Sequence, residues 1–234
     1  MSLIRQNLQA ITATIVASAQ ESGRPADAVR LLAVSKTFGP EAVLEAVQAG
    51  QRAFGENYLQ EGLDKILAVQ AAGASALEWH FIGPIQSNKT RPIAENFAWV
   101  HTVEREKIAQ RLSEQRPAGL PPLQICLQVN ISGEASKSGV APEELAALAH
   151  KVAALPNLTL RGLMAIPEPA VEFEQQRAAF ARLRVLYEQL RAGGLALDTL
   201  SMGMSADMRA AIFEGATIVR VGSAIFGARN YTKA

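Results

Sequence analysis

The sequence predicts a (β/α)8 barrel. Eight apolar, strand-like runs alternate with helix-like runs along the 234 residues, which is the order of elements in such a barrel. The composition does not shift along the chain, so we expect residues 1–234 to form a single domain. A doubly wound open sheet is the alternative, but it would place a glycine-rich phosphate loop after its first strand. Ser35-Lys36-Thr37 stands there instead, which favours the barrel.

The elements up to residue 115 follow from apolar periodicity and from the residues that break it. Ile4, Leu8, Ile11 and Ile15 recur at helical spacing after the N-cap residue Ser2 and predict an opening helix. Short apolar runs separated by Gly and Pro then predict strands and helices in turn. The strands are expected at 31–37, 52–54, 79–82 and 98–101, and the helices at 40–49, 59–67, 88–96 and 104–115.

The second half of the chain repeats this alternation. Pro142 begins a helix, Pro156 follows its end, and Gly193 and Gly215 end two later helices. A polar loop is expected over 130–139. The strands are expected at 123–129, 158–164, 199–202 and 217–221, and the helices at 142–155, 173–190 and 207–214, with a short apolar run at 224–226.

Charge and composition exclude several classes of protein. The formal net charge is +1 with no long basic run, which argues against nucleic acid or a membrane surface as the main partner. No secretory signal and no apolar run of about 18 residues are present, so we expect a cytoplasmic protein. The single cysteine, Cys126, lies in an apolar run and predicts a core residue rather than a disulfide. No cluster has the spacing of metal ligands.

Lys36 is the first candidate functional residue. It follows an apolar run, and strand alternation would place Leu32, Val34 and Lys36 on one face. An amine at the carboxyl end of a barrel strand, partly removed from water, has a lowered pKa and can attack a carbonyl carbon. The alternative is a lysine that extends to solvent.

Two loops predict a phosphate site opposite this amine. In (β/α)8 barrels the loops after strands seven and eight often hold phosphate. Here these loops are 201–205 and 220–223, and they offer hydroxyl groups, small residues and backbone N–H groups. Ordinary turn chemistry is the alternative for each loop taken alone. An amine facing a phosphate site indicates a phosphorylated carbonyl compound, either pyridoxal 5′-phosphate (PLP) or a sugar phosphate.

Five motifs of the chain carry a resemblance to a known family. They are Val34-Ser35-Lys36-Thr37, Phe54-Gly55-Glu56-Asn57-Tyr58, His80-Phe81-Ile82-Gly83-Pro84-Ile85-Gln86-Ser87-Asn88-Lys89, Ser201-Met202-Gly203-Met204-Ser205-Ala206-Asp207 and Val219-Arg220-Val221-Gly222. Together they resemble the YggS/PROSC family of PLP homeostasis proteins, and the similarity covers nearly the whole chain.

The resemblance implies the barrel of the alanine racemase N-terminal domain and a PLP-binding protein without established turnover. It implies a Schiff base between PLP and Lys36, and Arg220 near the pyridine nitrogen. It places the phosphate on Ser201, Ser205, Gly222 and Ser223. PLP-dependent apoenzymes are the implied recipients of the cofactor, and we expect a monomer.

Arg220 predicts a bound cofactor with weak catalytic reactivity. A guanidinium stays protonated and cannot accept a hydrogen bond, so a pyridine nitrogen facing it remains unprotonated. An unprotonated ring is a poorer electron sink. The alternative for Arg220 is a surface charge after the eighth strand.

Several other polar residues end strands or begin helices. Asn57 and His80 end strands two and three and are expected at the rim of the cofactor, with His80 making a structural hydrogen bond rather than acting as a base. His101 ends strand four and has a weaker case. Glu56 and Glu61 flank a helix start and are expected to be solvated carboxylates.

Three functions stay open. The first is a PLP carrier or regulator. The second is a PLP-dependent amino-acid racemase, which needs a second acid/base group opposite the lysine. Alanine racemase takes that group from the additional domain of a partner subunit, whereas this sequence reaches Ala234 soon after the eighth strand. The third is an aldolase-like enzyme that acts on a sugar phosphate.

Overall fold

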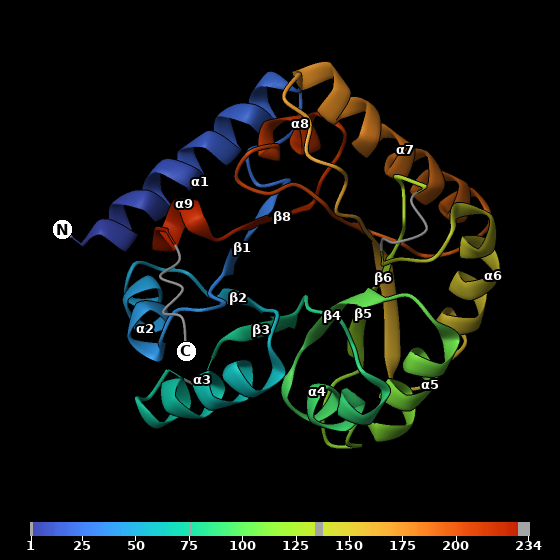
Figure 1. Ribbon diagram of the computed structural model, residues 1–234, viewed down its shortest axis with the longest axis horizontal. Helices are drawn as coiled ribbons and strands as arrows, with labels where there is room; N and C mark the ends of the chain where they lie inside the picture. The colour runs from blue at the N-terminus through green and yellow to red at the C-terminus, as the bar shows by residue number, and fades with distance from the viewer. Residues whose placement is uncertain (1, 75, 134–137, 229–234) are drawn as a thin grey trace.

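Eight parallel strands close into a barrel in which each strand pairs with its neighbours in chain order (Figure 1). The protein is described by a computed structural model that covers residues 2–74, 76–133 and 138–228. The strands are β1 (Arg30–Val34), β2 (Ala53–Glu56), β3 (Glu78–Phe81), β4 (Trp99–Val103), β5 (Leu123–Gln128), β6 (Leu158–Met164), β7 (Thr199–Ser201) and β8 (Ile218–Val221).

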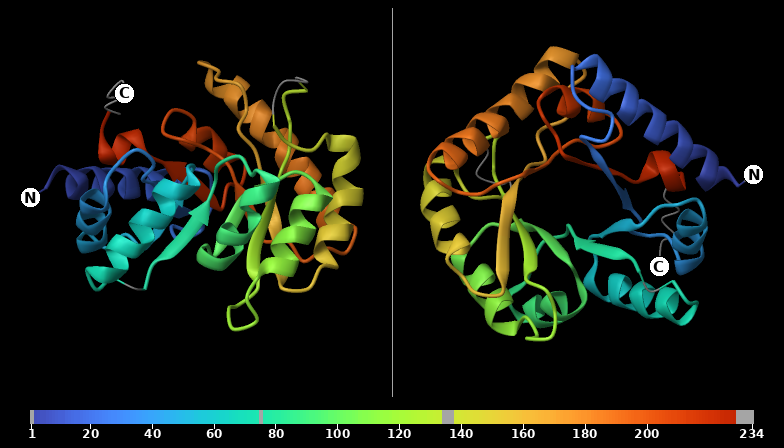
Figure 2. Two further views of the ribbon diagram at one scale, coloured as in Figure 1. Left: turned by 60° about the horizontal axis from the view of Figure 1, so that its bottom comes forward. Right: turned by 180° about the vertical axis from the view of Figure 1, so that it is seen from behind.

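Helices surround this barrel as an outer ring (Figures 1 and 2). They are α1 (Leu3–Glu21), α2 (Pro40–Gln48), α3 (Leu59–Ala71), the short 3-10 helix η1 (Ser87–Lys89), α4 (Thr90–Asn96), α5 (Glu106–Gln115), α6 (Pro142–Ala153), α7 (Phe173–Ala192), α8 (Met208–Phe213) and α9 (Ser223–Phe226). Ser2 caps α1, since its hydroxyl accepts a hydrogen bond from the Arg5 backbone N–H at 3.3 Å.

The predicted (β/α)8 barrel is confirmed. β1 and β8 pair in parallel, with Leu31 opposite Val219 and Leu32 opposite Arg220, and this pairing closes the sheet. The expected elements are present, with ends that differ by a few residues. Of the expected 130–139 loop, residues 134–137 lie outside the described ranges. The single domain over 1–234 stays a prediction, because residues 229–234 also lie outside them.

Apolar side chains form two separate layers. The larger layer lies between the strands and the outer helices and includes Phe54, Phe81 and Phe180. The smaller layer lies inside the barrel and is formed by Leu32, Val34, Ala53, Ile82, Trp99, Cys126, Met164 and Ile218. Cys126 is fully buried there, as predicted, and burial raises the pKa of its thiol to about 12.

The inner apolar layer does not fill the barrel alone. His80, His101, Ser201 and Arg220 are also buried inside it, so the centre of the molecule is polar. Buried polar groups need hydrogen-bond partners, and these four side chains bond to one another, as described below.

No helix in the described ranges is long and apolar enough to cross a membrane.

Candidate functional site

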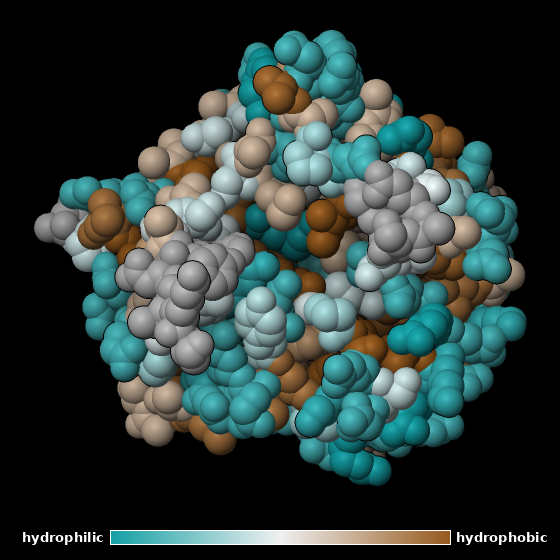
Figure 3. All heavy atoms as spheres, viewed as in Figure 1, coloured by the Kyte–Doolittle hydropathy of each residue, from teal (hydrophilic) through white to brown (hydrophobic). Residues whose placement is uncertain are grey.

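A cavity of about 250 Å³ opens at the carboxyl ends of the strands. Its walls come from residues that follow or end β1, β2, β3, β6, β7 and β8. The lining residues are Val34, Lys36, Asn57, Ile82, Ile166, Met204, Ser205, Ala206, Arg220, Gly222 and Ser223. Figure 3 shows this end of the molecule hollowed near its middle, with hydrophilic and hydrophobic side chains side by side in the hollow.

Lys36 lies on the wall of this cavity, two residues beyond the end of β1. Leu32 and Val34 belong to the apolar layer inside the barrel, and both Val34 and Lys36 line the cavity. The predicted alternation therefore continues past the last residue of the strand. Among the described lining residues, Lys36 and Arg220 are the two that carry ionisable side chains.

A buried ion pair supports the loop that carries Lys36. Behind the loop, the Lys65 ammonium donates to the Glu56 carboxylate at 2.6 Å and to the Ser35 carbonyl at 2.7 Å. Ser35 Oγ donates to the same Glu56 oxygen at 2.6 Å. Burial raises the pKa of Glu56, while the Lys65 charge lowers it. The expectation that Glu56 is solvated is therefore wrong, because its side chain is 0% exposed.

Glu61 completes this support from the other side. Its carboxylate lies 2.7 Å from the Lys65 ammonium and accepts a hydrogen bond from the Thr37 backbone N–H at 2.6 Å. Thr37 has φ 69°, a left-handed conformation that is uncommon for a residue with a Cβ. Hydrogen bonds on both sides of Lys36, at Ser35 and at Thr37, thus hold the turn that presents the amine.

Arg220 lies in β8 and is 4% exposed. Its Nη1 donates to Ser201 Oγ at 2.9 Å and its Nη2 donates to the Ala165 carbonyl at 3.0 Å. Burial lowers the pKa of Arg220 to about 10, so the guanidinium is still a cation at neutral pH. The alternative of a surface charge after the eighth strand is therefore wrong.

Ser201 and His80 lie deeper in the barrel, beneath the cavity. Ser201 Oγ is within 2.7 Å of His101 Nδ1, and His101 Nε2 is within 2.8 Å of His80 Nδ1. His80 Nε2 in turn lies 2.8 Å from a Glu78 oxygen. Burial lowers the pKa of both histidines, that of His101 strongly. The hydrogen-bonding role expected for His80 is present, and His101 lies within β4 rather than at its end.

The structure therefore brings together six of the eight residues expected at a cofactor site: Lys36, Asn57, Ser205, Arg220, Gly222 and Ser223. Ser201 and His80 are not among the described residues that line the cavity. Ser201 contacts Arg220 instead, and His80 contacts His101 and Glu78. Both side chains are buried inside the barrel, below the residues that line the cavity.

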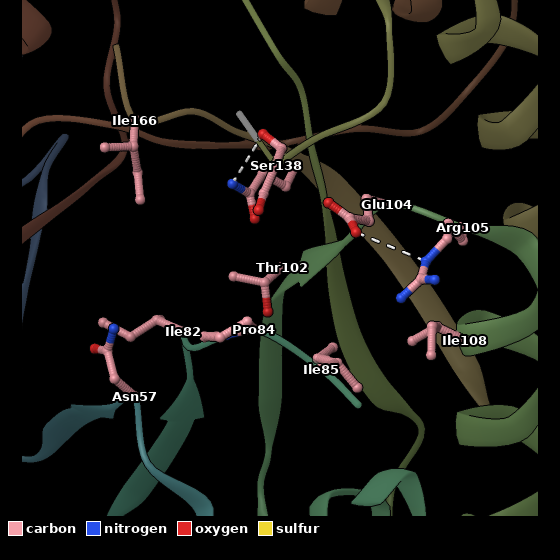
Figure 4. Close-up of a pocket in the computed structure, with 11 residues that line it drawn as sticks. Asn57, Ile82, Pro84, Ile85, Thr102, Glu104, Arg105, Ile108, Ser138 and Ile166 are labelled. Atoms are coloured by element: carbon pink, nitrogen blue, oxygen red, sulfur yellow. Dashed lines mark hydrogen bonds and ion pairs between the residues drawn. The ribbon is translucent and has the colours of Figure 1, made fainter. Parts of the chain in front are cut away.

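A second cavity of about 290 Å³ adjoins the first and shares Asn57, Ile82 and Ile166 with it (Figure 4). Glu104 and Arg105 form an ion pair at 3.6 Å on its far wall. Neither residue is among the candidates predicted from the sequence. The signal that could have found them is their place directly after β4, at the end of the barrel where functional loops gather.

The first cavity combines an amine, a buried guanidinium and two serine hydroxyls. An amine can condense with a carbonyl group, and hydroxyl groups with a nearby cation can hold an anion such as phosphate. In the described part of the chain, no group of three or more His, Cys, Asp or Glu side chains could hold a metal ion.

Residues 6–230 match the family model described as alanine racemase, N-terminal domain. The chain is 66% identical to a pyridoxal phosphate homeostasis protein of Pseudomonas aeruginosa, over 99% of this chain and 98% of the relative. It is 59% identical to one of Vibrio cholerae, over 100% of this chain and 99% of the relative.

Solved structures agree with these matches. PipY of Synechococcus elongatus PCC7942, solved without PLP, is 36% identical and superposes with a TM-score of 0.84, covering 96% of this chain and 100% of PipY. PipY with PLP bound is 35% identical, with a TM-score of 0.83 over the same shares of the two chains. An alanine racemase of Corynebacterium glutamicum is 20% identical with a TM-score of 0.65, covering 97% of this chain and 63% of the racemase. That last likeness shows the fold alone.

This chain is a (β/α)8 barrel protein with an amine-bearing cavity at the carboxyl end of its strands. It belongs to the alanine racemase N-terminal domain family and, within it, to the YggS/PROSC family of pyridoxal phosphate homeostasis proteins, as the motifs predicted.

Proposed function

We propose that this chain takes part in PLP homeostasis by binding PLP in the 250 Å³ cavity and holding it on Lys36. The observation that carries the proposal is that the Lys36 amine and the Arg220 guanidinium share one cavity with the Ser205 and Ser223 hydroxyls. The names of the relatives and the PLP-bound PipY structure support the same ligand.

The residues present fit this cofactor. Asn57 Oδ1 is buried and has no hydrogen-bond partner among the described residues, and Asn57 lines the cavity, so a donor on a bound ligand would satisfy it. Gly222 also lines the cavity, and a Cβ there would lie 3.0 Å from the Val34 carbonyl. A larger residue would push the Val34 backbone away, so glycine at this position lets the two cavity walls approach closely.

Each group has a role in the proposal. The Lys36 amine attacks the aldehyde carbon, a carbon–nitrogen double bond replaces the carbonyl, and one water leaves. Ser205, Gly222 and Ser223 bind the phosphate, with Ser201 acting on Arg220 rather than on the phosphate. Arg220 faces the pyridine nitrogen, and because it only donates hydrogen bonds, it keeps that nitrogen unprotonated. PLP supplies an electrophilic aldehyde and a ring that can accept electrons.

The proposal favours a carrier over an enzyme. Apart from Lys36 and Arg220, the residues described as lining the cavity are apolar, amide or hydroxyl residues and glycine, and they include no carboxylate, imidazole, thiol or phenol. Release of PLP by reaction with water or with another amine needs no such group. Delivery to PLP-dependent apoenzymes and action as a monomer in the cytoplasm are further parts of the proposal, and both stay predictions.

The test is an absorbance spectrum of the purified protein after incubation with PLP. We expect a yellow protein that borohydride bleaches, with the pyridoxyl group found on Lys36 by peptide mass spectrometry. Lys36→Ala should stay colourless, and Lys151→Ala, which changes an exposed lysine on α6, should behave as the wild type. A colourless wild type, or a label on another lysine alone, would favour the sugar-phosphate alternative.

A further inference from the structure

Five polar side chains form a continuous line of hydrogen bonds through the middle of the barrel. From the cavity downward, Arg220 Nη1 lies 2.9 Å from Ser201 Oγ, which lies 2.7 Å from His101 Nδ1. His101 Nε2 lies 2.8 Å from His80 Nδ1, and His80 Nε2 lies 2.8 Å from Glu78 Oε1. The line joins the cofactor cavity to the opposite, amino-terminal end of the barrel, where β3 begins with Glu78.

The Glu78 end of the line fixes the direction of its hydrogen bonds, since Arg220 donates to Ser201 in either direction. Arg220 can only donate, and an ionised Glu78 can only accept. If Ser201 accepts from Arg220 and donates its hydroxyl proton to His101 Nδ1, then His101 donates from Nε2 to His80 Nδ1. His80 then donates from Nε2 to Glu78. All four contacts are satisfied with both imidazoles neutral and both in the Nε2–H tautomer.

The opposite direction requires one more proton. If His101 Nδ1 donates to Ser201, then His80 Nδ1 donates to His101, and the bare His80 Nε2 faces the Glu78 carboxylate. Only protonation of His80 or of Glu78 removes that conflict. The hydrogen bond from His80, together with the Arg30 charge, lowers the pKa of Glu78 to about 2, and burial lowers the pKa of His80. Neither group carries the additional proton at neutral pH.

The surroundings leave the line little freedom to rearrange. The indole of Trp99 stacks on the His80 ring, with centroids 5.3 Å apart and planes within 7°. The guanidinium of Arg161 lies 4.9 Å from the centroid of Trp99 on that indole. The Arg30 guanidinium forms an ion pair with the Glu78 carboxylate at 2.5 Å. His80 and His101 are 1% and 0% exposed, so water does not compete for their ring nitrogens.

We propose that Glu78 is a positioning residue for Arg220, acting across the length of the barrel. Its carboxylate orients His80, His101 and Ser201 in turn, so that Ser201 presents an oxygen lone pair to Arg220 and holds the guanidinium at the cavity floor. The role of Glu78 in orienting Arg220 is argued from contacts within the protein. The proposed function enters only in naming PLP as the ligand that Arg220 contacts.

The direct test uses the cofactor-free protein. Nitrogen-15 spectra of histidine-labelled protein at pH 7 report the tautomer of each ring. We expect His80 and His101 in the Nε2–H form, with slowly exchanging ring protons. An Nδ1–H tautomer or an imidazolium at either residue would overturn the proposal. Because the wild type alone gives this result, the test stands even if a variant fails to fold.

Variants of Glu78 separate orientation from simple packing. Glu78→Gln keeps an oxygen that accepts from His80 and should preserve both tautomers. Glu78→Leu removes the acceptor and should give a mixture of His80 tautomers. Glu95→Leu is the matched control, since Glu95 borders the same amino-terminal pocket as Glu78 but bonds outside the line, to Arg91. Unchanged tautomers in Glu78→Leu would refute the proposal.

A second readout concerns the ligand. With PLP added, Glu78→Leu should shift the absorbance maximum of the bound cofactor and weaken binding roughly tenfold, about the worth of one hydrogen bond. Glu78→Gln should restore both properties. Failure of all variants and of the wild type to bind PLP would overturn the proposed function, whereas the tautomers of the cofactor-free protein would still decide the role of Glu78.

Discussion

The Lys65 ammonium lies 2.6 Å from the Glu56 carboxylate, and the two side chains are 3% and 0% exposed. Three oxygens surround the ammonium, from Glu56, Glu61 and the Ser35 carbonyl, so each of its three protons has an acceptor. The pair joins α3 to the residues just before Lys36. It therefore links the stability of the barrel to the placement of the amine.

Lys65→Met should lower the free energy of unfolding by about 3–5 kcal/mol, because it leaves the Glu56 charge buried without its partner. Urea unfolding followed by circular dichroism measures the change. Lys151→Met is the control, because the exposed Lys151–Glu106 pair should contribute less than about 1 kcal/mol. Adding Glu56→Gln to Lys65→Met should recover part of the loss. Equal stability of the two single variants would contradict this account of the ion pair.

Ser205→Ala combined with Ser223→Ala should weaken PLP binding while leaving the fold intact. Each hydroxyl lines the cavity, and a hydrogen bond to a charged group contributes roughly 1.5–3 kcal/mol. Fluorescence titration with PLP measures the loss, and Ser22→Ala, in the cap of α1, is the control. Unchanged affinity in the double variant would mean that backbone N–H groups hold the phosphate alone.

Ser201→Ala should act differently from these two changes. It removes the acceptor of Arg220 Nη1, so we expect the absorbance maximum of bound PLP to move together with the affinity. The phosphate variants should change the affinity alone. If Ser201→Ala and Ser205→Ala changed the affinity and the absorbance maximum in the same way, Ser201 would bind the phosphate, as the family resemblance implies.

The unfolding free energy should fall as the pH is lowered from about 6.5 to 5. Burial, and then the neighbouring positive charges, lower the pKa of His101 well below its ordinary value. Below pH 6.5 the unfolded chain therefore binds a proton that the folded chain does not. His101→Gln should reduce the slope of stability against pH by up to one proton, or about 1.4 kcal/mol per pH unit.

His150→Gln is the control for this slope. His150 is exposed on α6, so this substitution changes a histidine outside the buried line of hydrogen bonds. Urea titrations at several pH values give the slopes, and equal slopes for wild type and His101→Gln would contradict the account of the buried ring.

Protein loaded with PLP should give at most trace racemisation of L-alanine. The described residues lining the cavity include no carboxylate, imidazole, thiol or phenol that could act as a second acid/base group, and such assistance is typically worth 10²–10⁴-fold in rate. Chiral chromatography measures D-alanine, with Lys36→Ala as the control. Several turnovers per minute that depend on Lys36 would favour the racemase alternative.

The barrel could be predicted because each of its elements carries its own signal. Apolar runs of strand length alternate with helical periodicity, and glycine or proline separates them at residues such as Pro40 and Gly215. Lys36 could be placed for the same reason, since strand alternation fixes its face relative to Val34.

The depth of a residue inside the barrel could not be predicted. Ser201 and Ser205 belong to one motif, yet Ser201 lies beneath Arg220 while Ser205 lines the cavity. Which of them reaches a ligand depends on how far β7 extends relative to β8. Lys65 likewise matches an ordinary helix-surface lysine in sequence, and only the packing of α3 on β2 reveals that it faces Glu56.

The two hydrogen bonds that hold Arg220 have a consequence for affinity. The guanidinium donates to two groups of the protein itself, Ser201 and the Ala165 carbonyl. These contacts within the protein restrict its rotamers. Ordering a long side chain on binding costs about 0.5–1.5 kcal/mol, and for Arg220 this entropy has already been lost on folding. The favourable energy of its contact with a ligand is then not offset by a further loss of side-chain entropy when the ligand binds.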